Sequence, residues 1–106
     1  DIVDQYIAAL NSRDLARLAA LYYPSAALVT AKRTIQGLQA IQAWFQDFFT
    51  LIPSGAFFAV TSSGGALGSR HFTWQVSAPS FQATGSDTFG LVDKKIAYHF
   101  TQSSLL

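Results

Sequence analysis

The sequence contains no cysteine, which excludes disulfide bonds, zinc–thiolate sites and cysteine nucleophiles. It is also poor in charge: 12% of its 106 residues are charged, against about a quarter in an average globular domain. A chain of this length, with 50% hydrophobic residues, suits a single domain, 1–106, with one core. With so few charges a monomer would cover its apolar surface poorly, so we expect a homodimer that hides one face of a sheet.

Neither sign of charge dominates, since Lys and Arg number seven and Asp and Glu six. The basic footprint of nucleic-acid or anionic-membrane binding is missing, so we expect neither as a partner. No apolar run reaches the roughly 18 to 20 residues that span a bilayer. No signal peptide is visible, although the start at Asp1 rather than Met leaves open a removed leader or tag, and a cytoplasmic location is the default expectation.

Three helices are predicted in the first half of the chain. Ile2 to Leu10 has helical apolar spacing, and the second helix runs from Leu15 to Tyr22, before Pro24. Gly37 opens the third helix, whose apolar residues keep the 3.6-residue period as far as Pro53: Leu38, Ile41, Phe45, Phe48, Phe49 and Ile52.

Strands are predicted in the rest. Ala26 to Thr30 forms a short strand before the third helix. The later strands are Ala56–Ser62, Ala66–Ala78, Phe81–Val92 and Lys95–Gln102, with breaks at Gly64-Gly65, Pro79-Ser80 and Asp93-Lys94. Helices followed by antiparallel strands indicate an α+β fold with helices on one face of a sheet.

Asp87 stands out in the last third of the chain. Strand alternation places it on the same face as Phe89 and Leu91. A bare carboxylate on an apolar face costs several kcal/mol or more, roughly, unless it is paired, hydrogen-bonded or protonated. Asp87 is therefore either a local structural device or the polar group of a ligand site.

The order of elements and three stretches resemble the nuclear-transport-factor-2-like superfamily, which includes SnoaL-like polyketide cyclases and ketosteroid isomerase. VDQYIAALNSRDLARLAALYYPSAALVT looks like the family's paired helices and first strand, IQGLQAIQAWFQDFF like its glycine-started third helix, and SDTFGLVDKKI like its final hairpin. The resemblance covers nearly the whole chain. It implies a cystatin-like curved antiparallel sheet wrapped around helices, forming a cone whose interior pocket often holds an apolar small molecule.

The resemblance to ketosteroid isomerase also implies site residues. The family's oxyanion-hole tyrosine falls on Tyr6 and its protonated aspartate on Asp87. Its general base falls on Thr30, whose hydroxyl is too weak a base to take a proton from carbon, which argues against the usual isomerase activity. The glycine of the family's hairpin turn is Lys94 here.

His99 depends on the hairpin register. A two-residue turn at Asp93-Lys94 puts Tyr98 and Phe100 on the Asp87 face. A three-residue loop, which the resemblance favours, puts His99 opposite Asp87 as an acid–base pair. In the first case His99 is a surface or dimer-face residue.

Several other side chains have two interpretations each. Trp44, Phe72, Trp74 and Phe89, with Thr30, are expected to line the interior, although plain packing explains such aromatics equally well. Arg70 either binds an acidic group at the cone's mouth or is a sheet-edge arginine, and His71 faces away from the pocket. We expect no metal site, because two histidines without clustered carboxylates are too few ligands, and no cofactor.

The resulting hypothesis is a pocket that binds a small hydrophobic carbonyl compound. Tyr6 and protonated Asp87 would donate to the carbonyl oxygen and His99 would move a proton, as in a cofactor-independent isomerase, cyclase or dehydratase. One alternative is a non-catalytic ligand-binding protein, which the missing base at Thr30 favours. The other is a protein-association module, indicated if aromatic side chains fill the interior.

Overall fold

The structure is a computed structural model that describes residues 1–105. Its three helices lie in the first half of the chain: α1 (Ile2–Ser12), α2 (Leu15–Ala19) and, after two strands, α3 (Leu38–Thr50). The Asp1 carboxylate accepts a hydrogen bond from the Val3 backbone N–H (2.9 Å), so a side-chain cap starts α1. Asp14 caps α2 in the same way, whereas α3 follows Gly37 at a φ of 89°. No helix within residues 1–105 combines the length and apolar character needed to cross a membrane.

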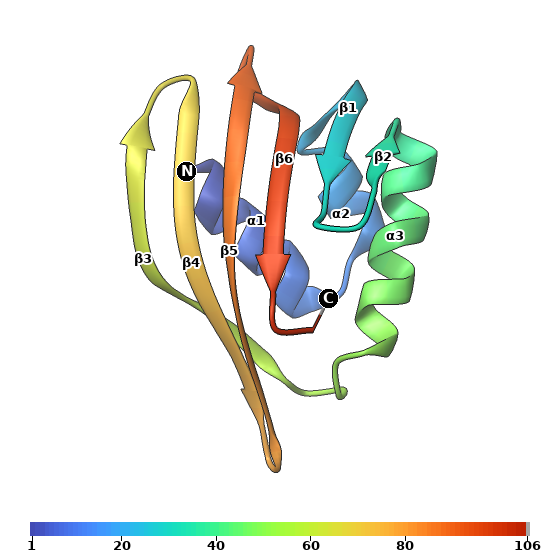
Figure 1. Cartoon of the computed structure of the whole chain (residues 1–106), viewed down its shortest axis with the longest axis vertical. Coiled ribbons are helices and arrows are strands. Elements are labelled where there is room, and N and C mark those ends of the chain that lie inside the picture. Colours follow the sequence, from blue (N-terminus) through green and yellow to red (C-terminus); the bar gives the residue numbers. More distant parts are fainter. Residues whose placement is uncertain (106) are drawn as a thin grey trace.

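Six strands form one sheet in the order β2-β1-β6-β5-β4-β3. Their bounds are β1 (Tyr22–Val29), β2 (Thr34–Gln36), β3 (Phe57–Ala66), β4 (Ser69–Ala78), β5 (Phe81–Val92) and β6 (Lys95–Ser103). All neighbours pair antiparallel except β1 and β6, which are parallel. The sheet is curved and open, α1 crosses behind β4, β5 and β6, and α3 lies beside β2 (Figure 1). The predicted α+β fold with three N-terminal helices is confirmed.

The core lies between the helices and one face of the sheet, called the inner face here. Cross-strand pairs place Phe72 opposite Asp87 and Arg70 opposite Phe89, so these four residues share that face. Aromatic residues of α1 and α3 cover it, and those that are buried are Tyr6, Trp44, Phe45, Phe48 and Phe49. No helix of residues 1–105 covers the other face, called the outer face (Figure 1).

The prediction that the second helix continues to Tyr22 is wrong. α2 ends at Ala19, and Tyr22 already pairs with Ile96 of β6. Pro24 does not end a helix but lies within β1, where the register with β6 shifts between Tyr22 and Ala27. A proline fits such an irregular stretch because it has no N–H to donate to the ladder.

The predicted strand break at Gly64-Gly65 is also wrong. Both glycines are paired in β3, and the turn comes later, at Leu67 and Gly68. An added Cβ on Gly65 would lie 2.1 Å from the Ser69 carbonyl oxygen, so glycine permits the close approach of two backbones there. The three-residue strand β2 escaped prediction because it is too short to show a period.

Candidate functional site

Asp87 is buried on the inner face, with 1% of its surface exposed. Its Oδ1 accepts hydrogen bonds from the Trp74 indole N–H (2.8 Å) and the Thr101 hydroxyl (3.0 Å). Its Oδ2 lies 2.5 Å from His99 Nε2 and accepts a long hydrogen bond, 3.5 Å, from the Tyr6 hydroxyl. Partners on both oxygens satisfy the carboxylate's acceptors and allow it to sit in an apolar core.

His99 reaches Asp87 through a register that neither predicted hairpin contained. Val92 pairs with Lys95, so the turn has two residues, Asp93 and Lys94, both with left-handed φ (50° and 65°). The expected three-residue loop is therefore wrong.

A β-bulge then moves His99 to the inner face. The register shifts between Gly90 and Leu91: Leu91 pairs with Ile96 but Gly90 with Tyr98, which leaves Ala97 unpaired. After this shift Phe89 is opposite His99 and Asp87 is opposite Thr101. His99 therefore lies on the face of Asp87 despite the short turn.

Tyr22 holds the other side of the His99 ring. Its hydroxyl lies 2.7 Å from His99 Nδ1, and both residues are buried. Tyr22 was predicted to lie in a helix and was therefore missed, although tyrosine is enriched in strands. Thr101 was missed too, because its position opposite Asp87 depends on the bulge. We call Tyr6, Tyr22, Trp74, Asp87, His99 and Thr101 the Asp87 network.

The two tyrosines of this network stay protonated at neutral pH. Burial, and to a lesser extent the charge of Asp87, raises the pKa of Tyr6 and of Tyr22 well above the usual value. The Tyr22 hydroxyl can donate to Nδ1 of a neutral His99, and it can accept from Nδ1–H of a protonated one. The Tyr22 hydroxyl therefore fits either hydrogen-bonding role of Nδ1, and Asp87 occupies the other ring nitrogen.

The aromatic side chains expected to line an open pocket instead fill the interior. Phe72 and Phe89 have no exposed surface, and Trp74 and Trp44 are 3% and 8% exposed. The Tyr6 ring packs edge-on against Phe72, Phe89 and His99, with ring centroids 5.8, 5.2 and 5.4 Å away. The space next to Asp87 is thus closed, because rings from α1 and from the sheet occupy it.

Three other candidate residues lie outside the network. The Thr30 hydroxyl donates to the Arg33 carbonyl and accepts from the N–H groups of Lys32 and Arg33, all at 3.2 Å, so it stabilises the β1–β2 turn. His71 lies on the outer face, as predicted, 2.9 Å from the Thr88 hydroxyl. Arg70 forms an ion pair with Asp1.

The sequence profile of the SnoaL-like domain matches residues 3–99, almost the whole chain. The chain belongs to the SnoaL-like domain family. No curated protein matches it significantly.

Solved structures share the fold of this SnoaL-like domain. A Sinorhizobium meliloti protein proposed to be a polyketide cyclase has a TM-score of 0.82 and 23% identity, covering 96% of this chain and 94% of that one. A Kribbella flavida protein proposed to be a ketosteroid isomerase has a TM-score of 0.79 and 17% identity, and the match covers 94% of this chain and 73% of that one. A Catenulispora acidiphila protein with a ketosteroid isomerase-like fold, in complex with trimethylamine, has a TM-score of 0.81 and 16% identity. The match covers 96% of this chain and 84% of that one. These likenesses establish the fold.

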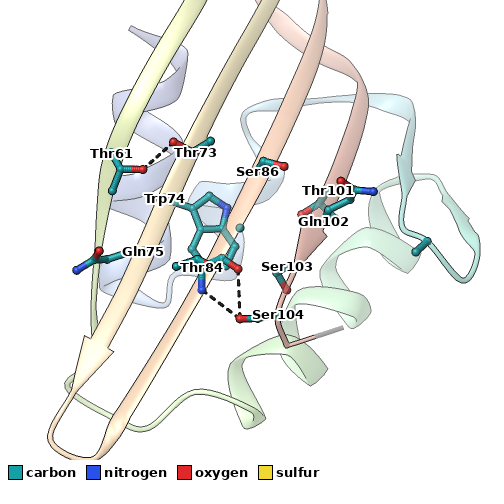
Figure 2. Close-up of a pocket in the computed structure, with 12 residues that line it drawn as sticks. Thr61, Thr73, Trp74, Gln75, Thr84, Ser86, Thr101, Gln102, Ser103 and Ser104 are labelled. Carbon is teal, nitrogen blue, oxygen red and sulfur yellow. Dashed lines mark hydrogen bonds between the residues drawn. The ribbon is translucent and has the colours of Figure 1, made fainter.

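The outer face of this SnoaL-like domain carries a groove of about 570 Å³ across β4, β5 and β6 (Figure 2). Its walls are hydroxyl and amide side chains in cross-strand rows: Thr61, Thr73, Gln75, Thr84, Ser86, Gln102 and Ser104. Trp74 and Thr101, which donate to Asp87, also border it. Among residues 1–105 no charged side chain lines the groove, so these residues offer it hydrogen bonds rather than charge.

Proposed function

We propose that this SnoaL-like domain is a cofactor-independent acid–base enzyme that acts on a small hydrophobic carbonyl compound. The observation that carries the proposal is His99, held between the carboxylate of Asp87 and the phenol of Tyr22 inside an apolar core. Pairs of titratable groups whose protonation is controlled by burial and by each other are typical of acid–base sites.

In this proposal Tyr22 is the proton donor. Its phenol gives a proton to the carbonyl oxygen and is reprotonated from Nδ1 of an imidazolium His99, which Asp87 stabilises. Tyr6 donates a second hydrogen bond to the same oxygen. The two phenols replace the expected pair of Tyr6 and protonated Asp87, because protein donors already surround both Asp87 oxygens.

The chemistry of Thr30 narrows the substrate class. A threonine hydroxyl cannot remove a proton from carbon, so the network supplies the acid rather than the base of the reaction. Acid-catalysed dehydration of a β-hydroxy ketone fits such a site: Tyr22 protonates the carbonyl oxygen and a water molecule takes the α-proton, which forms the enol. The enol then expels the β-hydroxyl, which leaves as water with that proton, and the proton on the carbonyl oxygen returns to Tyr22. No cofactor is part of the proposal.

Ligand binding requires aromatic side chains to move. Phe45, Phe72 and Phe89 are fully buried, whereas Trp44 is 8% exposed and stacks on Phe48 with ring centroids 5.2 Å apart. A surface cavity of about 340 Å³ between β2 and α3 borders Trp44. We propose that a ligand enters there by displacing the Trp44 and Phe48 rings.

The test uses 4-hydroxy-4-methyl-2-pentanone, a small β-hydroxy ketone, and follows its dehydration by the absorbance of the enone product. We expect catalysis by the wild type and a loss of about 100-fold or more in His99→Gln and Tyr22→Phe, the usual range for a lost acid–base group. His71→Gln, on the outer face, is the matched control and should leave the rate unchanged. No catalysis, together with no chemical-shift change in inner-face amides at millimolar ligand, would contradict the proposal.

A second candidate function is protein association through the outer face, as a homodimer. It is favoured by the closed interior and by the lack of Asp, Glu, Lys or Arg at the outer-face positions, which are every second residue along Ser69–Ser77, Gln82–Gly90 and Tyr98–Gln102. Light scattering at micromolar concentration tests it. A dimer that Ser86→Lys, in the middle of the groove, converts to monomer would support it, and a wild-type monomer would contradict it.

A further inference from the structure

A second cavity, of about 660 Å³, lies at the end of the fold where α1 begins. The N-terminus and the β3–β4 and β5–β6 turns lie toward this end (Figure 1). We call it the Arg70 cavity. Its size falls within the range of small-molecule sites, roughly 300 to 1,000 Å³. Phe89, which pairs with Arg70 in the β4–β5 ladder, packs its ring on Tyr6 and His99, two members of the Asp87 network.

Cationic side chains outnumber anionic ones in the Arg70 cavity. Arg70, Lys94 and Lys95 face Asp1 and Asp93, which leaves one net positive charge. The Asp93 carboxylate is already engaged, since it accepts a hydrogen bond from the Tyr23 hydroxyl (2.7 Å). The cavity therefore suits a ligand with a single negative charge.

Arg70 already binds a carboxylate in this cavity. Its Nη1 donates to both oxygens of Asp1 at 2.8 Å, and its Nε donates to the Gly64 carbonyl (3.3 Å), which holds the guanidinium in place. Its Nη2 has no hydrogen-bond partner among residues 1–105. A guanidinium with one nitrogen free to donate can bind a second carboxylate, or it can exchange the first carboxylate for another.

The rest of the cavity wall is apolar. Ile2, Leu21 and Leu91 lie beside the charged groups, and Leu67 in the β3–β4 turn is 97% exposed. An exposed leucine contributes no burial free energy to the fold. A hydrocarbon chain lying against Leu67 would remove its apolar surface from water, which is favourable. Cationic and apolar side chains in one cavity match a ligand with an acidic head and an apolar tail.

We propose that the Arg70 cavity binds an amphiphilic monocarboxylate. Its carboxylate takes the place of the Asp1 carboxylate on Arg70, and its hydrocarbon chain covers Leu67 and Leu91. Asp1 thus competes with the ligand for the guanidinium. The site is independent of the function proposed for the Asp87 network.

The experiment titrates the labelled protein with sodium octanoate and follows the amide signals of Gln5, Leu21 and Leu91 by NMR. We expect Arg70→Gln to weaken binding about tenfold or more, the usual effect of losing a charge-assisted hydrogen bond. Asp1→Asn should tighten binding about threefold or more, because asparagine still caps α1 but no longer competes as an anion. Lys32→Gln, which removes an exposed cation in the β1–β2 turn, is the matched control and should change nothing.

The neutral analogue 1-octanol should bind about tenfold more weakly than octanoate. Equal binding of the two compounds, or no binding of octanoate at millimolar concentration, overturns the proposal. Weaker binding in Asp1→Asn also overturns it, since Asp1 would then support the site instead of competing for it. If Arg70→Gln does not fold, Asp1→Asn and the comparison with octanol decide the matter.

Discussion

The indole ring of Trp74 occupies the space that a side chain at residue 85 would need. Gly85 is directly opposite Trp74 in the β4–β5 ladder, and an added Cβ would lie 2.2 Å from Cζ2 of the ring. In this position the ring N–H donates to Asp87 Oδ1 at 2.8 Å. Glycine at residue 85 therefore allows Trp74 to support the Asp87 network.

Gly85→Ala should destabilise the protein by about 2–4 kcal/mol, the combined effect of overpacking and of a lost hydrogen bond to a buried carboxylate. Urea denaturation measures it. In a Trp74→Phe background the same substitution should cost less, because the indole contact is gone and the Gln102 carbonyl oxygen, 2.9 Å from the added Cβ, is the close contact that stays. Gly64→Ala, where an added Cβ meets nothing within 4 Å, is the control. Equal costs for the two alanine variants would mean that Trp74 does not need the space.

Asp87→Asn should destabilise the fold by about 3–5 kcal/mol, because His99, Trp74 and Thr101 lose a buried anionic partner. Asp47→Asn, an exposed change on α3, should stay within about 0.5 kcal/mol. Urea midpoints at neutral pH compare the two. If Asp87→Asn lowered the free energy of unfolding by less than about 1 kcal/mol, the Asp87 network would not be a major source of stability.

Alkaline pH should unfold the protein through Tyr6 and Tyr22. Burial raises the folded-state pKa of both phenols, so they favour folding fully below the unfolded-state value near 10. Above pH 10 the unfolded chain releases these protons and the folded one keeps them, so stability falls as pH rises.

The predicted slope is about 1.4 kcal/mol per pH unit for each tyrosine, or about 2.7 for the pair. Urea midpoints between pH 10 and 11.5 measure it. Tyr22→Phe removes one of the two groups and should roughly halve the slope. An unchanged slope in this variant would assign the alkaline transition to other residues.

Asn11 joins α1 to the edge strand β3. Its side-chain amide donates to the Phe58 carbonyl (3.0 Å) and its carbonyl accepts from the Phe58 N–H (2.7 Å). Asn11→Ala should cost about 2–3 kcal/mol, because both backbone groups lose their partner next to a buried side chain. Gln42→Ala, which removes one long hydrogen bond (3.4 Å), should cost well under 1 kcal/mol. Chemical denaturation ranks the two variants, and similar losses would contradict this assignment.

Predictions from the sequence were most accurate for helices and strands whose apolar residues follow a single short-range period. The bounds of β5 follow from Phe81–Val92, and the face of Asp87 follows from alternation along that strand. The third helix follows from the spacing of Phe45, Phe48 and Phe49. Tyr22 was misassigned because its apolar spacing continues the preceding helix, and only pairing with β6 turns it into a strand residue.

The sequence by itself determined the order of elements, the α+β class, the likeness to SnoaL-like domains and the inner-face position of Asp87, because these depend on neighbours along the chain. The tertiary structure alone decided which side chains meet Asp87. One bulge at Ala97 turns His99 inward, and pairing of β1 with β6 brings Tyr22 to it. It also decided that aromatic rings close the interior, since packing in three dimensions sets how much space is left.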